Sequence, residues 1–219
     1  MHRNLSFGRR AAQRGKSRSL VVFVHGYGAD GSDLLGLADA LSPHLPDTAF
    51  VAPDAPESIE GFPQGRRWFG IPRFDGSSVE EVQAGLARSA ADLNAFLDAR
   101  LSEEALGPEA LAVVGFSQGA MVSYEAIPQR AAPVAAVVAI SGALLYPQAL
   151  RDATSRPPFL VMHGDDDEVV PFGAMQEACD ALVECGFSTE GHVMTRTGHG
   201  ISEDGVAQAL GFLKRFLPG

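Results

Sequence analysis

A serine between two glycines could place a reactive hydroxyl at the end of a strand. Ser117 is flanked by Gly115 and Gly119, with an apolar run at 111–114 before it and a helix-like run at 120–127 after it. A strand, a tight turn and a helix in this order are the context of a nucleophile elbow. Glycine is needed on both sides because a side chain there would clash with the crossing strand and helix. The alternative is a small-residue turn whose serine only caps the helix.

The partners that such a serine needs follow two other strand-like runs. Three aspartates, 165–167, come after the apolar run 159–162, and His199 lies in a glycine-rich loop after 187–194. A histidine can take the serine proton and return it to a leaving group, while an aspartate holds the ring in the required tautomer. The chain order serine, aspartate, histidine is that of α/β-hydrolases. The residues alone leave open which aspartate acts, and they leave a surface-loop histidine as the alternative for His199.

Backbone amides near the first strong strand could stabilise developing negative charge. The apolar run 19–24 leads into the loop 25–31, whose Gly and Asp content indicates a tight turn with exposed N–H groups. We expect an oxyanion hole made by the amide of Gln118 and by one amide of the segment 25–28. Each such donor contributes about 3 kcal/mol in a transition state.

Apolar runs alternate with helical patterns throughout, which predicts an α/β fold in one domain, 1–219. The sheet should be mostly parallel with helices on both faces, and the groups named above should meet at the carboxyl ends of its strands. The motif Ser78-x-x-Glu81 resembles a capping box before the longest helix. Strands are predicted at 19–24, 48–52, 111–114, 134–140, 159–162 and 187–194, and helices from about residue 32 and at 79–101, 120–127, 172–185 and 203–217.

Two stretches do not follow this alternation. Residues 1–18 contain six basic residues and no acidic one, and we expect a solvated edge strand or hairpin rather than a basic arm that binds an anionic partner. Residues 53–78 form the longest irregular stretch, and their aromatic content favours an ordered flap. Trp68 in this flap either packs against the core or lines a substrate pocket, and we assign Trp68 and Phe69 to substrate binding.

Bulk properties exclude several classes of partner. The net charge of −10 over 219 residues argues against nucleic acid or an anionic membrane. No apolar run reaches the length of a membrane span, and no signal-peptide pattern is recognised. Cys179 and Cys185 are expected to be free thiols in a reducing cytoplasm, and they form no zinc site. The aspartates at 165–167 lack the alternating spacing of a calcium loop, so no metal is expected.

The motifs together resemble those of the phospholipase/carboxylesterase family of α/β-hydrolases, which includes acyl-protein thioesterases and small bacterial carboxylesterases. The likeness spans about 19–217. It departs from the family pattern at Tyr27, where leucine is frequent, and at Gly70, where an aspartate often follows the Trp-Phe pair. The motifs that carry it are His25-Gly26-Tyr27-Gly28-Ala29-Asp30-Gly31, Trp68-Phe69, Gly115-Phe116-Ser117-Gln118-Gly119-Ala120-Met121, Ser141-Gly142, His163-Gly164-Asp165-Asp166-Asp167-Glu168-Val169-Val170-Pro171 and Gly198-His199-Gly200-Ile201.

The resemblance implies an α/β-hydrolase fold without a large cap domain, Asp167 as the acid, and the amides of Tyr27 and Gln118 as oxyanion donors. It implies a serine esterase that acts through an acyl-enzyme on small esters of short to medium acyl chains, with no cofactor. We also expect Asp165 and Asp166 to disfavour anionic substrates if they lie near the site.

The alternative within the same class is an acyl-protein thioesterase or a lysophospholipase-type activity on longer chains. Outside this class, a binding protein without turnover and a lipid-surface protein remain; the latter lacks a strongly basic amphipathic helix. The sequence leaves the oligomeric state open, with a homodimer as one alternative.

Overall fold

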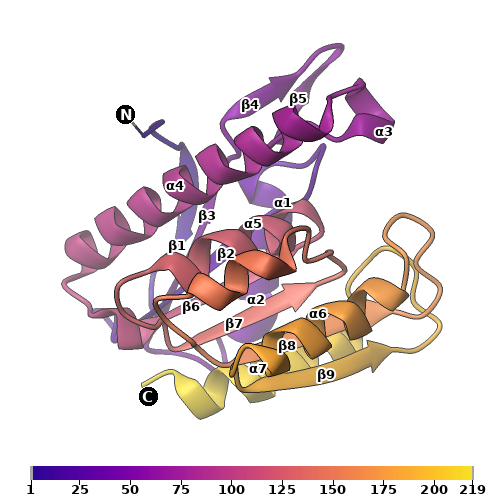
Figure 1. Cartoon of the computed structure of the whole chain (residues 1–219). Coiled ribbons are helices and arrows are strands. Elements are labelled where there is room, and N and C mark those ends of the chain that lie inside the picture. The colour runs from indigo at the N-terminus through magenta and orange to yellow at the C-terminus, as the bar shows by residue number, and fades with distance from the viewer. Residues whose placement is uncertain (1, 219) are drawn as a thin grey trace.

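A seven-stranded sheet forms the centre of the protein in the computed structural model, which describes residues 2–218 (Figure 1). Its strand order is β1-β3-β2-β6-β7-β8-β9. All neighbours are parallel except β1, which pairs antiparallel with β3. The predicted mostly parallel sheet is therefore confirmed. The strands are β1 (Phe7–Arg10), β2 (Ser19–Val24), β3 (Thr48–Pro53), β6 (Leu111–Phe116), β7 (Ala136–Ile140), β8 (Phe159–Gly164) and β9 (Thr189–Met194).

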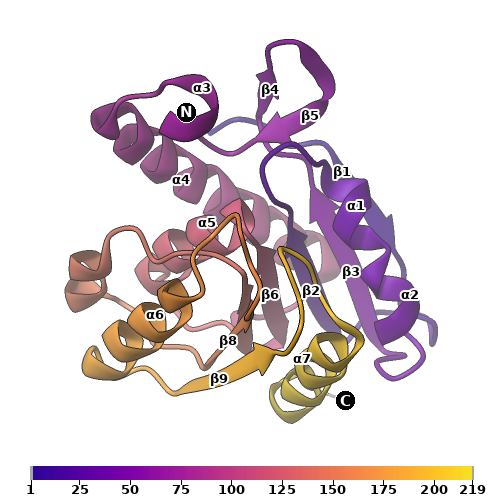
Figure 2. The same ribbon diagram turned by 90° about the vertical axis from the view of Figure 1, so that its right-hand side faces the viewer.

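Helices cover both faces of this sheet (Figure 2). The helices α4, α5 and α6 lie on one face and α1, α2 and α7 on the other. Three short 3₁₀ turns, η1, η2 and η3, connect elements at Pro108–Ala110, Ile127–Gln129 and Pro147–Asp152. The helices are α1 (Gly31–Leu35), α2 (Leu37–Leu41), α3 (Pro72–Asp75), α4 (Val79–Glu104), α5 (Gln118–Ala126), α6 (Gly173–Glu184) and α7 (Glu203–Phe216).

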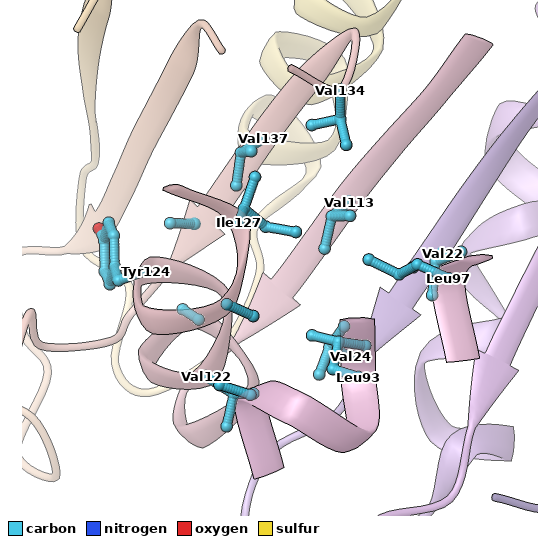
Figure 3. Packing of buried hydrophobic residues seen from close by; sticks show 14 of the residues in the cluster. Val22, Val24, Leu93, Leu97, Val113, Val122, Tyr124, Ile127, Val134 and Val137 are labelled. Carbon is cyan, nitrogen blue, oxygen red and sulfur yellow. The ribbon is translucent and has the colours of Figure 1, made fainter. Parts of the chain in front are cut away.

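The strand β2 explains why this sheet needs both helical layers. Its side chains alternate between two cores: Val22 and Val24 pack with α4 and α5, whereas Val21 and Phe23 pack with α1, α2 and α7. Figure 3 shows the first of these cores, where strand valines meet leucines of α4. Because both faces of the strand are covered, its sequence is a continuous apolar run rather than an alternating one.

The long helix α4 begins as its sequence predicts. Ser78 accepts from the Glu81 amide, and the Glu81 carboxylate accepts from the Ser78 amide, which confirms the capping box. Its apolar positions from Val82 to Leu101 face the core, whereas Val79, at the first turn, is exposed. Within residues 2–218, none of the helices combines the length and the apolar character that crossing a membrane requires.

The stretch 53–78 is more regular than predicted. It contains an antiparallel hairpin of β4 (Glu57–Ile59) and β5 (Phe62–Arg67), followed by the single turn α3. Its glycines and prolines obscured the strand pattern, but Gly61 provides the left-handed residue of the hairpin turn, with φ +75°. Among the described residues, this hairpin and α3 are the only structure inserted above the sheet, in agreement with the absence of a large cap domain.

The basic N-terminal segment is an edge strand tied to the rest of the molecule. The strand β1 pairs with β3, so the segment does not form a hairpin with itself. Arg3 contacts both Glu57 and Asp92, and Arg9 contacts Glu104. Arg3 and Arg9 thus form ion pairs with acidic residues of the same chain.

Candidate active site

The serine of the predicted elbow has a strained backbone. Ser117 follows β6 and precedes α5, with φ 53° and ψ −117°, values that a residue with a side chain rarely adopts. A Cβ at Gly119 would overlap the Val24 carbonyl oxygen, and one at Gly115 would lie 2.6 Å from the Gly119 oxygen. The two glycines are thus required because α5 passes close to β2 and β6 at this point.

The structure brings Ser117, His199 and Asp167 together at the carboxyl end of the sheet. His199 Nε2 lies 2.9 Å from Ser117 Oγ, and His199 Nδ1 lies 2.8 Å from Asp167 Oδ2. The imidazole packs against the Phe116 ring, with centroids 4.9 Å apart. With Nδ1 donating to the carboxylate, Nε2 is the basic nitrogen and faces the hydroxyl. The three groups therefore have the connections of a serine activated by a histidine.

Of the three consecutive aspartates, only Asp167 contacts His199. Its side chain is fully buried, and its second oxygen, Oδ1, accepts hydrogen bonds from the amides of Val169 and Val170 at 2.8 and 2.9 Å. Burial raises the pKa of this carboxyl, but the hydrogen bonds from His199, Val170 and Val169 outweigh burial and hold the pKa below its usual value. Asp167 is therefore ionised at neutral pH.

A second histidine, His163, contacts both Asp167 and the loop that holds it. His163, at the end of β8, is completely buried, and its Nε2 lies 3.0 Å from the Val170 carbonyl oxygen and 3.2 Å from Asp167 Oδ2. Both neighbours are acceptors, so Nε2 carries a proton and donates to the Val170 carbonyl. This contact fixes the loop whose amides bind Asp167.

The two amides predicted as oxyanion donors belong to Gln118, which follows Ser117 in the chain, and to Tyr27, in the loop after β2. The loop after β2 passes close to Ser117. A Cβ placed on Gly26 would lie 3.2 Å from Ser117 Cβ. On either side of Tyr27 this loop is held by Gly28 N donating to Arg66 O and Ala29 N donating to Gly26 O. In the part of the chain described, residues 2–218, the amides of Tyr27 and Gln118 donate to no protein acceptor.

His25 fixes the start of the same loop. Its Nδ1 donates to Gly26 O at 2.7 Å, and its Nε2 accepts from the Ala55 amide at 2.9 Å, which links the end of β2 to the segment after β3. Burial lowers the pKa of His25, and the bond to Gly26 only partly offsets it. The ring is therefore neutral at neutral pH, as the accepting role of Nε2 requires.

The side chains of Trp68 and Phe69 lie in the core, which corrects the prediction that they bind substrate. Both are fully buried, and neither lines the pocket beside Ser117. Instead, the Trp68 indole donates to His25 O at 3.0 Å. The buried Gln118 side chain accepts from Trp68 N and donates to Phe69 O, both at 2.8 Å. These hydrogen bonds connect the pair to the first residue of α5 and to the start of the loop after β2.

The pocket above Ser117 has a volume of about 330 Å³. Residues of the flap and of the loop after β8 form most of its wall, and sequence analysis assigned none of these to substrate. A detectable signal was the concentration of large apolar residues in the flap, which includes Ile71 and Phe74. The lining residues are Tyr27, Ile71, Arg73, Phe74, Ser117, Met121, Val169, Val170 and His199.

Several known proteins are similar to this chain in sequence and in fold. A family model described as Phospholipase/Carboxylesterase matches residues 10–217. The crystal structure of esterase PE8 is similar, with a TM-score of 0.92 and 37% sequence identity over 97% of this chain and 99% of that chain. Acyl-protein thioesterase 1 of Debaryomyces hansenii is 25% identical over 94% of this chain and 95% of its own length. Esterase YpfH of Escherichia coli is 25% identical over 92% of this chain and 84% of its own.

Proposed function

The chain belongs to the phospholipase/carboxylesterase family, and from this premise we propose that it is a serine hydrolase of carboxylic esters. The observation that carries the proposal is the chain of hydrogen bonds from Ser117 through His199 to Asp167 at the wall of an open pocket. Ser117, His199 and Asp167 form its catalytic triad.

In the proposed reaction, His199 Nε2 takes the proton of Ser117 Oγ as the oxygen attacks the ester carbonyl. The amides of Tyr27 and Gln118 donate to the oxyanion of the tetrahedral intermediate. His199 then protonates the leaving alcohol, and the acyl group stays on Ser117 as an ester. A water molecule that gives its proton to His199 attacks this acyl-enzyme, which releases the acid and restores the serine. Asp167 stabilises the imidazolium in both halves of the cycle.

The pocket supports small esters with short to medium acyl chains as substrates. Its volume of about 330 Å³ is near the lower end for small-molecule sites, and its wall is mostly apolar. The alternative is thioester or lysophospholipid hydrolysis on longer chains, which the similarity to a protein named acyl-protein thioesterase 1 supports. Two exposed phenylalanines outside the pocket lining are available for apolar contact with a longer chain: Phe62 of β5, and Phe172, which follows the loop 165–171 that carries Asp167, here called the acid loop.

We further infer a cytoplasmic protein that acts on small molecules rather than on nucleic acid. Cys179 and Cys185 are free thiols in the structure, which suits a reducing compartment. The net charge of −10 disfavours polyanionic partners. A homodimer remains one alternative for the oligomeric state.

The proposal is tested with p-nitrophenyl esters from acetate to palmitate and the matching acyl thioesters. The wild type should hydrolyse short and medium esters best, and Ser117→Ala should lose on the order of a million-fold in kcat. Ser102→Ala, on an exposed position of α4, serves as the matched control and should keep full activity. A rate that is equal in the wild type and Ser117→Ala would favour a binding protein instead. A preference for thioesters or long chains would favour the alternative substrate class.

A further inference from the structure

One lining residue of the pocket has a permanent charge. Arg73 is exposed on α3 and shares the pocket wall with Ser117 and His199. The other lining residues are apolar, apart from Tyr27, Ser117 and His199. Among the described residues, the Arg73 guanidinium has no carboxylate within 4.0 Å. Its positive charge is therefore available to a substrate.

Two carboxylates of the flap, those of Asp75 and Glu57, are bound to groups other than Arg73. Asp75, two residues later, accepts from Arg67 Nη1 at 2.5 Å and from the amides of Ile71 and Ser77 at 3.0 Å. Glu57 contacts both Arg67 and Arg3, at 3.2 and 3.1 Å. Arg67 is thus neutralised, and the charge of Arg73 has no such counterpart.

The turn that carries Arg73 is held in one position. The Asp75 carboxylate caps it, and the amides of Phe74 and Gly76 donate to Ile71 O and Pro72 O. The Phe74 ring lies 5.2 Å from the Tyr27 ring, centroid to centroid, and the Arg73 guanidinium carbon lies 5.8 Å from the Phe74 centroid. A guanidinium presented by a fixed turn loses less entropy when it binds an anion.

None of the four carboxylates at residues 165–168, in the loop after β8, is among the residues that line the pocket. Asp165 and Asp166 are exposed and do not line the pocket, and Asp165 Oδ1 instead accepts weakly from the Thr197 amide, at 3.4 Å. Asp167 is buried behind His199. The net charge of −10 repels anions at long range, but salt screens this repulsion beyond about 8 Å at physiological ionic strength. Among the residues that line the pocket, Arg73 therefore carries the one permanent charge that a bound substrate can contact directly.

We propose that Arg73 binds a carboxylate of the substrate, so that the enzyme selects esters that carry a second, ionised carboxyl group. Half-esters of short dicarboxylic acids are the simplest members of this class. A guanidinium can donate two parallel hydrogen bonds to a carboxylate, which a neutral ester of the same length cannot accept in the same way. The inference rests on the proposed function, since Ser117 must attack the ester group of the same molecule.

The test compares monoethyl adipate with diethyl adipate, which share one carbon skeleton and differ in charge. Acid release is measured at constant pH for the wild type, Arg73→Gln, Arg73→Lys and Ser117→Ala. The ratio of kcat/KM for the half-ester to that for the diester should fall about tenfold in Arg73→Gln, because a partly exposed charged pair contributes modestly. Arg73→Lys should lose less. Added salt should lower the ratio in the wild type and have little effect on it in Arg73→Gln.

The control variant is Arg18→Gln, which removes the same charge from an exposed position just before β2, at the other end of the sheet. It should leave the ratio at its wild-type value. A ratio that is unchanged in Arg73→Gln, or that falls equally in Arg18→Gln, would overturn the role of Arg73 and leave the esterase proposal standing. Hydrolysis of the diester at the same rate by the wild type and Ser117→Ala would instead overturn the proposed function itself.

Discussion

At the scale of single residues, the surroundings of Asp167 determine how His199 is held. The carboxylate has no solvent contact, yet its pKa is below the usual value because three donors offset its burial. Two of these donors are consecutive amides of the acid loop, at Val169 and Val170. An ionised, immobile carboxylate both selects the histidine tautomer and stabilises the imidazolium that forms during proton transfer.

His163 is expected to act as a positioning residue through this loop. His163→Leu removes the donor to Val170 O, so Asp167 and His199 should shift, and kcat should fall by about 10- to 100-fold with little change in KM, because His163 does not line the pocket. His163→Gln, whose amide can still donate, should recover part of the rate. Steady-state kinetics on one ester measures both, with exposed His44→Gln as the control. A full kcat in His163→Leu, or a loss confined to KM, would exclude the positioning role.

The sequence predicted the residues that the structure brings together at the site, but not all of their surroundings. Ser117 and His199 could be found because their glycine-rich contexts are local in the chain. The choice among three consecutive aspartates could not be made from the residues alone, because it depends on which carboxylate the loop turns toward His199. Trp68 was wrongly assigned to substrate binding, since its aromatic ring suits a pocket as well as a core.

At the scale of elements, the flap is fastened to the elbow by the first residue of α5. The Gln118 side chain is completely buried and bonds the backbone at Trp68 and Phe69, where β5 leads into the loop before α3. Ser89 of α4 donates to Trp68 O from the opposite side. Gln118 therefore follows Ser117 directly in the chain and anchors the flap with its side chain.

Gln118→Met tests how much the side-chain hydrogen bonds of Gln118 contribute to the stability of the protein. The substitution keeps the backbone amide and a similar side-chain volume, but it leaves Trp68 N–H and Phe69 C=O buried without this partner. The free energy of unfolding should fall by about 2 kcal/mol, measured by urea denaturation. Gln129→Met, at an exposed position, should change it by less than about 0.5 kcal/mol. Equal stability of the two variants would show that the Gln118 contacts contribute nothing to holding the flap.

The regular elements were predictable where their apolar pattern was continuous. The strands β2, β6, β7 and β8 are buried on both faces, and their runs are visible in the sequence. The hairpin β4–β5 was not visible, because its residues are largely exposed and its stability comes partly from the pairing of Glu57 with Arg67. Such cross-strand contacts leave no period-2 apolar signal.

At the scale of the whole molecule, the parallel sheet explains why residues far apart in sequence share one site. The strands β2, β6, β8 and β9 point in the same direction, so the loops that follow them meet at one edge. Ser117 and His199 are separated by 82 positions and are nevertheless hydrogen-bonded. This arrangement could be predicted from the alternation of strands and helices together with the rule that ligands gather at the carboxyl ends of such strands.

The proposed activation of Ser117 by His199 can be tested by covalent labelling with a fluorophosphonate. Intact-mass measurement followed by peptide mapping should find one adduct per chain, on Ser117, and none on Ser117→Ala. His199→Ala should label about 10²- to 10⁴-fold more slowly, because the general base is lost. An adduct on another residue would contradict the role of Ser117 as the nucleophile. Equally fast labelling of His199→Ala would contradict the role of His199 as its base.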